Sequence, residues 1–135
     1  MNAQQKTDIE SIRRFVATVG ASQRNRSPDD FIALFAPDAV WVTGGGIRLT
    51  GRDEIDAFTR RVLTPALGDV HATYAVEHVL FVDDNVAAVN VRATPVRGDG
   101  TRIEGELEGS KLYVLKRNAE SWTFASSHNG FIQPQ

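Results

Sequence analysis

The 135-residue chain contains no cysteine, one methionine and no excess of basic residues. The lack of cysteine excludes disulfides, thiolate metal ligands and a cysteine nucleophile. With 15 basic and 17 acidic residues the net charge is -2, so the basic surface that binds nucleic acid is missing. No segment reaches the roughly 18 consecutive apolar residues of a transmembrane helix, and the N-terminal residues lack the apolar run of a secretory signal. We therefore expect a cytoplasmic protein that binds neither nucleic acid nor membrane.

Hydrophobic residues make up 41% of the chain and charged residues 24%, a balance typical of a folded globular domain. The length suits one domain and leaves no room for a second core. We expect residues 1–135 to form this single domain, since no repeat, proline-rich linker or low-complexity tract divides the chain.

Two helix starts are predicted near the N-terminus. Thr7 and Glu10 have the spacing of a capping box, in which each side chain accepts a hydrogen bond from the other residue's backbone amide. Apolar residues then recur at intervals of three and four, which predicts a helix with one buried face. Ser27 before Pro28 predicts the start of a second, short helix.

A third helix is predicted after two β-rich segments. Residues 39–43 and 47–49 favour extended structure. Thr50 and Asp53 then have capping-box spacing, and the helix that follows should stop before Pro65.

From residue 70 onward the hydrophobic period changes to two, which predicts long antiparallel strands joined by short turns. Helices followed by such a meander indicate an α+β fold, with three N-terminal helices packed on a strongly curved, mostly antiparallel sheet. Strands this long exceed the usual five or six residues and have to curl, so the sheet should form a cone whose mouth is a pocket. The predicted strands are residues 70–82, 86–96, 101–116 and 122–132.

The lining of that pocket is predicted from alternation along the last strand. Trp122, Phe124, Ser126 and His128 share one face, and we expect this face to point inward. An imidazole in an apolar pocket can act as a general acid, a general base or a hydrogen-bond donor, so His128 is the candidate catalytic residue. The predicted ligand-binding residues are Trp41, Thr43, Phe58, Val62, Tyr74, Ser126 and Asn129.

Metal and cofactor sites are not expected. His71 and His78 are separated by an odd number of residues, which places them on opposite faces of a regular strand. The three glycines at 44–46 lack the Lys-Ser/Thr of a phosphate-binding loop, and the chain has no dinucleotide fingerprint.

Three stretches carry a family resemblance: Phe-Ala-Pro-Asp-Ala-Val-Trp-Val at 35–42, Leu-Thr-Gly-Arg-Asp-Glu-Ile at 49–55, and the closing residues 122–129. Together with the order of elements they resemble the nuclear transport factor 2-like superfamily, its SnoaL-like proteins and, more narrowly, the SgcJ/EcaC branch. The resemblance spans about residues 6–131. It implies a cone-shaped, cystatin-like α+β fold, often dimeric through the sheet, with one pocket per subunit.

The resemblance does not imply one activity, because the superfamily includes isomerases, cyclases, dehydratases, association domains and non-catalytic binders. The position similar to the oxyanion-hole tyrosine of ketosteroid isomerases is Phe15, which has no hydroxyl. The position similar to their catalytic aspartate is Thr43, which cannot act as a carboxylate base. The pair His128-Asn129 is the feature shared with the SgcJ/EcaC branch.

Three hypotheses follow. The first is a homodimer that binds a small apolar or aromatic organic molecule, with His128 as the orienting hydrogen-bond donor. The second is a polyketide cyclase or isomerase in which His128 moves a proton, and the third is a non-catalytic dimerisation domain whose own side chains fill the cone. Dimerisation is predicted because Val79, Phe81 and Val114 are expected on an outer sheet face that needs cover.

Overall fold

The computed structural model describes residues 1–119 and 121–134 as three helices, a 3-10 turn and one curled sheet. The helices and the turn are α1 (Ala3–Arg24), α2 (Pro28–Ile32), α3 (Arg52–Val62) and η1 (Pro65–Leu67). The strands are β1 (Phe35–Val42), β2 (Arg48–Thr50), β3 (His71–Asp83), β4 (Val86–Val96), β5 (Gly109–Asn118) and β6 (Ser121–Phe131).

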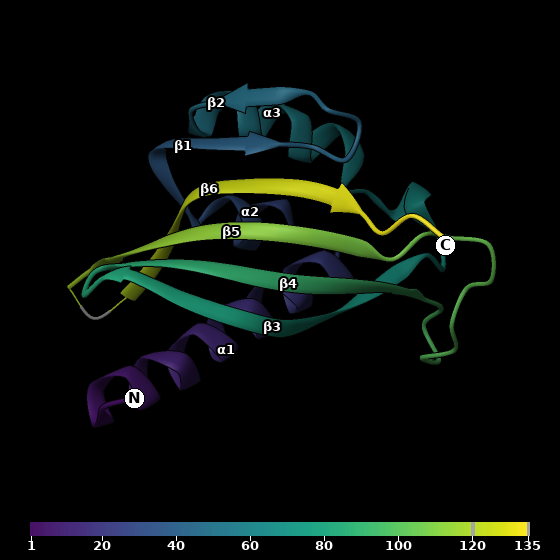
Figure 1. Ribbon diagram of the computed structural model, residues 1–135. Helices are drawn as coiled ribbons and strands as arrows, with labels where there is room; N and C mark the ends of the chain where they lie inside the picture. The colour runs from purple at the N-terminus through teal and green to yellow at the C-terminus, as the bar shows by residue number, and fades with distance from the viewer. Residues whose placement is uncertain (120, 135) are drawn as a thin grey trace.

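The six strands form one sheet in the order β2-β1-β6-β5-β4-β3. Every neighbouring pair is antiparallel except β1 and β6, which run parallel. Helices α1 and α2 pack against one face of the sheet, and α3 lies beside β1 and β2 (Figure 1). The predicted α+β fold with helices on a curved, mostly antiparallel sheet is confirmed.

The first helix begins earlier than the sequence predicts. Asn2 is its N-cap and forms a reciprocal capping box with Gln5. Thr7 lies inside the helix, where its hydroxyl donates to the carbonyl of Ala3. Two overlapping capping patterns compete here, and the earlier one gains an extra turn of helix.

Of the other two predicted helix N-caps, the one at Ser27 is confirmed and the one at Thr50 is wrong. Ser27 caps α2 as predicted, with its hydroxyl accepting from the amide of Asp30. At α3 the N-cap is Gly51, at φ +87°, and it offers no side-chain cap. The amide of Thr50 donates instead to the carboxylate of Glu54, at 2.9 Å, so the predicted box of Thr50 and Asp53 is wrong.

The third long strand begins at Gly109 and not at residue 101. Residues 97–108 form a loop between β4 and β5, with Gly100 and Gly105 in the left-handed region at φ +90° and +86°. This conformation favours glycine, and two such positions bend the chain out of the sheet. In Figure 1 the loop extends from the same end of the sheet as the C-terminus.

The outer face of the sheet, away from the helices, is less apolar than predicted, because β3 contains a bulge. Glu77 has no cross-strand partner between two regular pairs with β4. The extra residue puts Val79 and Phe81 on the same face as Tyr74, and all three pack against the core. The prediction that Val79 and Phe81 face outward is therefore wrong. Of the three residues predicted on the outer face, Val114 alone lies there.

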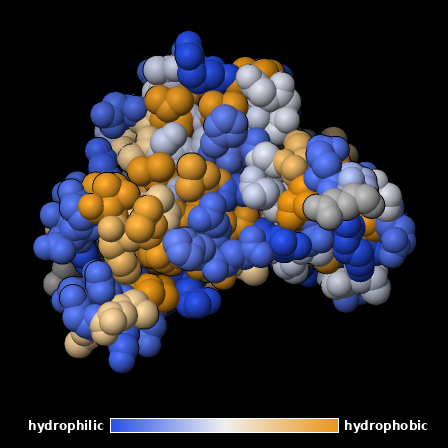
Figure 2. All heavy atoms as spheres, viewed as in Figure 1, coloured by the Kyte–Doolittle hydropathy of each residue, from blue (hydrophilic) through white to orange (hydrophobic). Residues whose placement is uncertain are grey.

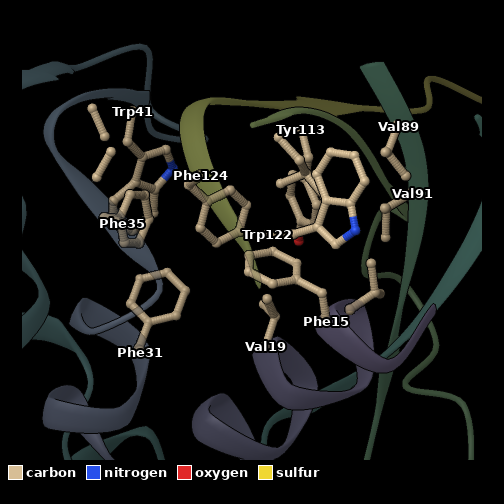
Figure 3. Close-up of a cluster of buried hydrophobic side chains, with 14 of the residues drawn as sticks. Phe15, Val19, Phe31, Phe35, Trp41, Val89, Val91, Tyr113, Trp122 and Phe124 are labelled. Carbon is tan, nitrogen blue, oxygen red and sulfur yellow. The ribbon is translucent and has the colours of Figure 1, made fainter. Parts of the chain in front are cut away.

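Phe124 of β6 lies at the centre of the core (Figure 3). Its ring centroid is 4.5 Å from that of Phe35, 4.8 Å from Tyr113 and 4.9 Å from Phe15. Offset and edge-on aromatic pairs of this kind add stability beyond the area they bury. These contacts join β6 to α1, β1 and β5.

A buried ion pair joins the first helix to the sheet. The guanidinium of Arg117 binds both carboxylate oxygens of buried Asp8, at 2.6 and 2.9 Å, and lies 4.6 Å from the ring centroid of Trp122. Its hydrogen bonds hold the pKa of the Asp8 carboxyl below its usual value. This pair fixes the start of α1 to the end of β5.

Removing the central ring should unfold the protein more easily. We expect Phe124→Ala to lower the free energy of unfolding by about 3–5 kcal/mol, because it leaves a cavity between four aromatic neighbours. The matched control Phe131→Ala, at a ring that is 51% exposed, should cost less than about 1 kcal/mol. Urea unfolding measures both, and similar losses for the two variants would contradict this account of the core.

Candidate functional site

A bulge in β6 determines which of its side chains face the helices. Leu115 of β5 pairs with Phe124, and the preceding Val114 pairs with Ser126, so Ala125 has no partner on β5. A bulge inserts one residue and reverses the alternation beyond it. Phe124 faces inward before the bulge, and the odd-numbered residues face inward after it.

The predicted orientation of Ser126 and His128 is therefore wrong. Ser127 is buried beside Trp41 of β1, its neighbour in the sheet, and Asn129 follows on the same inner face. His128 is exposed and Ser126 is half-buried, and neither lines the hollow at the mouth of the cone. An acid–base role of His128 in that hollow has no geometric support.

The hollow itself lies between α1, α2, β1, β3, β5 and β6 and has a volume of about 100 Å³. Its floor is apolar and aromatic, and its walls carry amide, hydroxyl and amine groups. The lining residues are Val19, Gln23, Phe31, Trp41, Tyr74, Lys111, Tyr113, Phe124, Ser127 and Asn129. We call this space the inner hollow.

A second space, which we call the outer hollow, has a volume of about 240 Å³. It shares Tyr74, Lys111 and Asn129 with the inner hollow, so these three side chains lie between the two spaces. The rest of its lining is mostly apolar and comes from the start of β3, the end of β4, the loop before β5 and the end of β6: Val70, His71, Ala72, Ala93, Pro95, Glu106, Leu107, Gly109, Gly130 and Phe131.

Lys111 provides the only amine in the lining of the inner hollow. Its Nζ donates to Oδ1 of Asn129 at 3.1 Å and lies 5.8 Å from the centroid of the Tyr74 ring. Burial away from water disfavours the charged form and lowers the pKa of this amine from 10.5 to about 8. At neutral pH Lys111 is therefore a cation held in a poorly hydrated place.

Two tyrosines face the same space. Burial raises the pKa of Tyr74 to about 12 and that of Tyr113 well above its usual value, and the nearby Tyr74 raises the latter further. Both phenols thus stay protonated at neutral pH and can donate hydrogen bonds. Gly20 of α1 lets the Tyr74 ring approach closely, because a Cβ at this position would lie 3.2 Å from Cδ2 of the ring.

The predicted ligand-binding residues separate into two groups. Trp41, Tyr74 and Asn129 line the inner hollow. Thr43 is buried elsewhere and its hydroxyl accepts from the amide of Ile47, so it belongs to the turn after β1. Three others also lie outside the lining: Phe58, which packs edge-on against Trp41 at 5.3 Å, Val62, exposed on α3, and outward-facing Ser126.

The prediction missed the polar residues contributed by α1 and β5. Lys111, Tyr113 and Leu115 are every second residue of β5 and share its buried face, and this period of two is visible in the sequence. A lysine in register with two core residues is the signal that could have found the site. Gln23 at the end of α1 and Ser127 after the bulge carry no comparable signal.

No group of three or more His, Asp or Glu side chains able to hold a metal ion occurs within residues 1–119 and 121–134. In the same part of the chain, none of the helices is both long and apolar enough to span a bilayer.

A curled sheet backed by helices, with a hollow at its open end, defines a cone-shaped α+β protein. The profile of the SnoaL-like domain matches residues 4–128, and the chain belongs to this family. The SnoaL-like resemblance expected from the sequence is confirmed, and the narrower SgcJ/EcaC assignment stays a prediction. No curated protein matches the chain significantly.

Solved structures with the same fold have diverse names. A domain of unknown function with a cystatin-like fold from Nostoc punctiforme is 24% identical, with a TM-score of 0.82 over 95% of this chain and 79% of that one. A ketosteroid isomerase-like protein from Erwinia carotovora atroseptica is 19% identical (TM-score 0.72; 93% and 96% covered). The hexachlorocyclohexane dehydrochlorinase LinA-type3 from Novosphingobium barchaimii is 13% identical (0.76; 96% and 90%). At these identities the likeness shows the fold alone.

Because the Lys111 amine is buried, the wild-type protein should be less stable at neutral pH than a variant with an apolar side chain at this position. Because the folded protein binds this proton less tightly than the unfolded chain, stability rises with pH between about 8 and 10.5. We expect Lys111→Met to raise the free energy of unfolding by about 3 kcal/mol at pH 7. This advantage should shrink steadily above pH 8.

Urea unfolding of both proteins at pH 7, 8, 9 and 10 measures this difference, and the titration of the tyrosines largely cancels between them. Lys116→Met, at a partly exposed lysine of the same strand whose Nζ lies 3.8 Å from Asp38, serves as the control and should show no such trend. An advantage of Lys111→Met that stays constant up to pH 10 would contradict the buried charge.

Proposed function

We propose that this protein binds a small, largely apolar organic molecule in the inner and outer hollows. The observation that supports this proposal best is the mixed lining of the inner hollow, in which an aromatic floor faces a few polar groups. Ligand sites in proteins have this composition, because apolar walls supply affinity and a few polar groups fix orientation.

The size of the ligand follows from the two volumes. An apolar cavity of about 150 Å³ holds benzene. The inner hollow, at about 100 Å³, is smaller than that, whereas the outer hollow adds about 240 Å³. A ligand with at least one ring would therefore extend from Trp41 past Tyr74 and Lys111 into the outer hollow.

Two other hypotheses have less support. A cyclase or isomerase that uses His128 lacks its acid–base group, because this side chain lies on the outer sheet face. A dimerisation domain whose cone is filled by its own side chains is disfavoured by the two hollows. The neighbouring isomerase-like and dehydrochlorinase structures agree with small-molecule chemistry in this fold without fixing the reaction. The cytoplasmic location stays a prediction.

We also propose that the protein forms a homodimer through the outer face of the sheet. Leu80 and Leu112 are 56% and 40% exposed there, with Val114 and Val42 half-buried beside them. In Figure 2 apolar side chains gather over the strands, bordered by polar ones. An apolar patch on a broad sheet favours a second copy as its cover.

Ligand binding is testable with a neutral probe. We expect acetophenone to bind across the two hollows, with its ring in the larger outer hollow and its acetyl group beside the aromatic floor, and therefore to shift the NMR signal of the Trp41 indole. Ser127→Leu fills the inner hollow and should weaken binding at least tenfold. Ser126→Leu, one residue away on the opposite face, is the matched control and should change binding less than twofold. Equal effects of the two variants, or no binding of acetophenone at millimolar concentration, would contradict the proposal.

Light scattering tests the homodimer. The wild-type protein at micromolar concentration should have twice the mass of one chain, and Leu112→Glu should halve it by placing a charge in the interface. Val62→Glu alters a residue of similar exposure (39%) on α3 and should leave the dimer intact. A monomeric wild-type protein would rule out the proposed interface.

A further inference from the structure

Within residues 1–119 and 121–134, no carboxylate forms an ion pair with the Lys111 amine, and Glu106, which lines the outer hollow with it, is not paired with it. None of the residues that line the inner hollow is Asp or Glu, and the hydrogen-bond acceptor of the amine is the neutral amide of Asn129. A buried charge is expensive unless it is paired, so such groups are usually paired or hydrogen-bonded. The missing partner of Lys111 is therefore expected to come from outside the chain.

Every other polar side chain that lines the inner hollow can also donate a hydrogen bond, Gln23 through its amide NH₂. Oδ1 of Asn129 accepts from the amine, which leaves its NH₂ group to donate. Tyr74 and Tyr113 are protonated phenols, and Ser127 adds a hydroxyl. Together these side chains present an amine, two amide NH₂ groups and three hydroxyls to one space. A ligand that meets them needs acceptor oxygens.

We propose that the ligand is a monoanionic organic acid whose carboxylate pairs with Lys111 where the two hollows meet. This inference rests on the proposed function and specifies the chemistry of its ligand. The apolar part of the acid would occupy the aromatic floor beside Trp41 or the apolar outer hollow. Its two oxygens would accept from the Lys111 amine and from the hydroxyls of Tyr74 and Tyr113.

Other charged groups nearby favour one negative charge over two. A second cation near Tyr74 is Arg26, which is close enough to affect the pKa of Tyr74. Its guanidinium already donates to the carbonyls of Gly68 and Val70, so these donors are not available to a second acidic group of the ligand. On the outer side, Glu106 and His71 line the outer hollow. The Glu106 carboxylate would repel a second acidic group placed there.

Binding of the acid should be linked to protonation of Lys111. An anion binds the protonated amine and raises its pKa, so binding takes up a proton at pH values between the pKa of the free site and the higher pKa of the complex. The pKa of the free site is about 8. Affinity for a carboxylate should accordingly fall about tenfold between pH 7 and pH 9, whereas affinity for a neutral molecule should not change.

The test compares benzoate with acetophenone, a neutral molecule of nearly the same size and shape. Titration calorimetry at pH 7 should give at least tenfold tighter binding of benzoate to the wild-type protein. Lys111→Met should remove this preference, because it weakens benzoate binding at least tenfold more than it weakens acetophenone binding. Lys111→Gln is a second variant without the charge and should behave alike, while Lys116→Met should retain the preference.

The outcomes separate this inference from the proposed function. Acetophenone and benzoate binding with equal affinity, insensitive to Lys111→Met and to pH, would overturn the organic-acid ligand and leave the pocket standing. Failure of both probes to bind the wild-type protein would overturn both proposals. Calorimetry at pH 9 in two buffers of different ionisation enthalpy should show uptake of nearly one proton with benzoate, and uptake of none would also overturn the inference.

Discussion

The unpaired residue Ala125 in β6 is the constraint on which the site depends. A regular strand would continue the alternation set by Phe124 and turn His128 toward the helices. The bulge turns Ser127 and Asn129 inward instead, which places the Asn129 amide 3.1 Å from the Lys111 amine. One inserted residue thus exchanges an imidazole for an amide at the mouth of the cone and decides which chemistry the hollow can support.

The buried amine shows how stability and function oppose each other here. An apolar side chain at Lys111 would fit the face of β5 that carries Tyr113 and Leu115, and it would avoid the desolvation of a charge. Arg117 shows the alternative arrangement. Its guanidinium is also largely buried, but it is paired with the Asp8 carboxylate through two hydrogen bonds. A charge left unpaired at the open end is typical of a site that receives its partner from a ligand.

Much of the fold follows from the sequence, because long segments with a clear hydrophobic period can be assigned as helices or strands. The predicted strand 86–96 has the observed bounds of β4, and Ser27 caps its helix as expected. The failures have local causes. Competing caps at Asn2 shift the first helix start, and Gly105 keeps residues before Gly109 in a loop where the period alone predicts a strand. Bulges decide the site, and a pattern of alternating residues does not contain them.

The central claim is that the Lys111 amine lies desolvated in the hollow, and NMR titration of the lysine side chains tests it most directly. Lys116, on the same strand but partly exposed, serves as the internal reference. We predict that the Lys111 signal titrates with a pKa of about 8 in the free protein. A Lys111 pKa at the ordinary value near 10.5 would place the amine in bulk water and contradict the site described above.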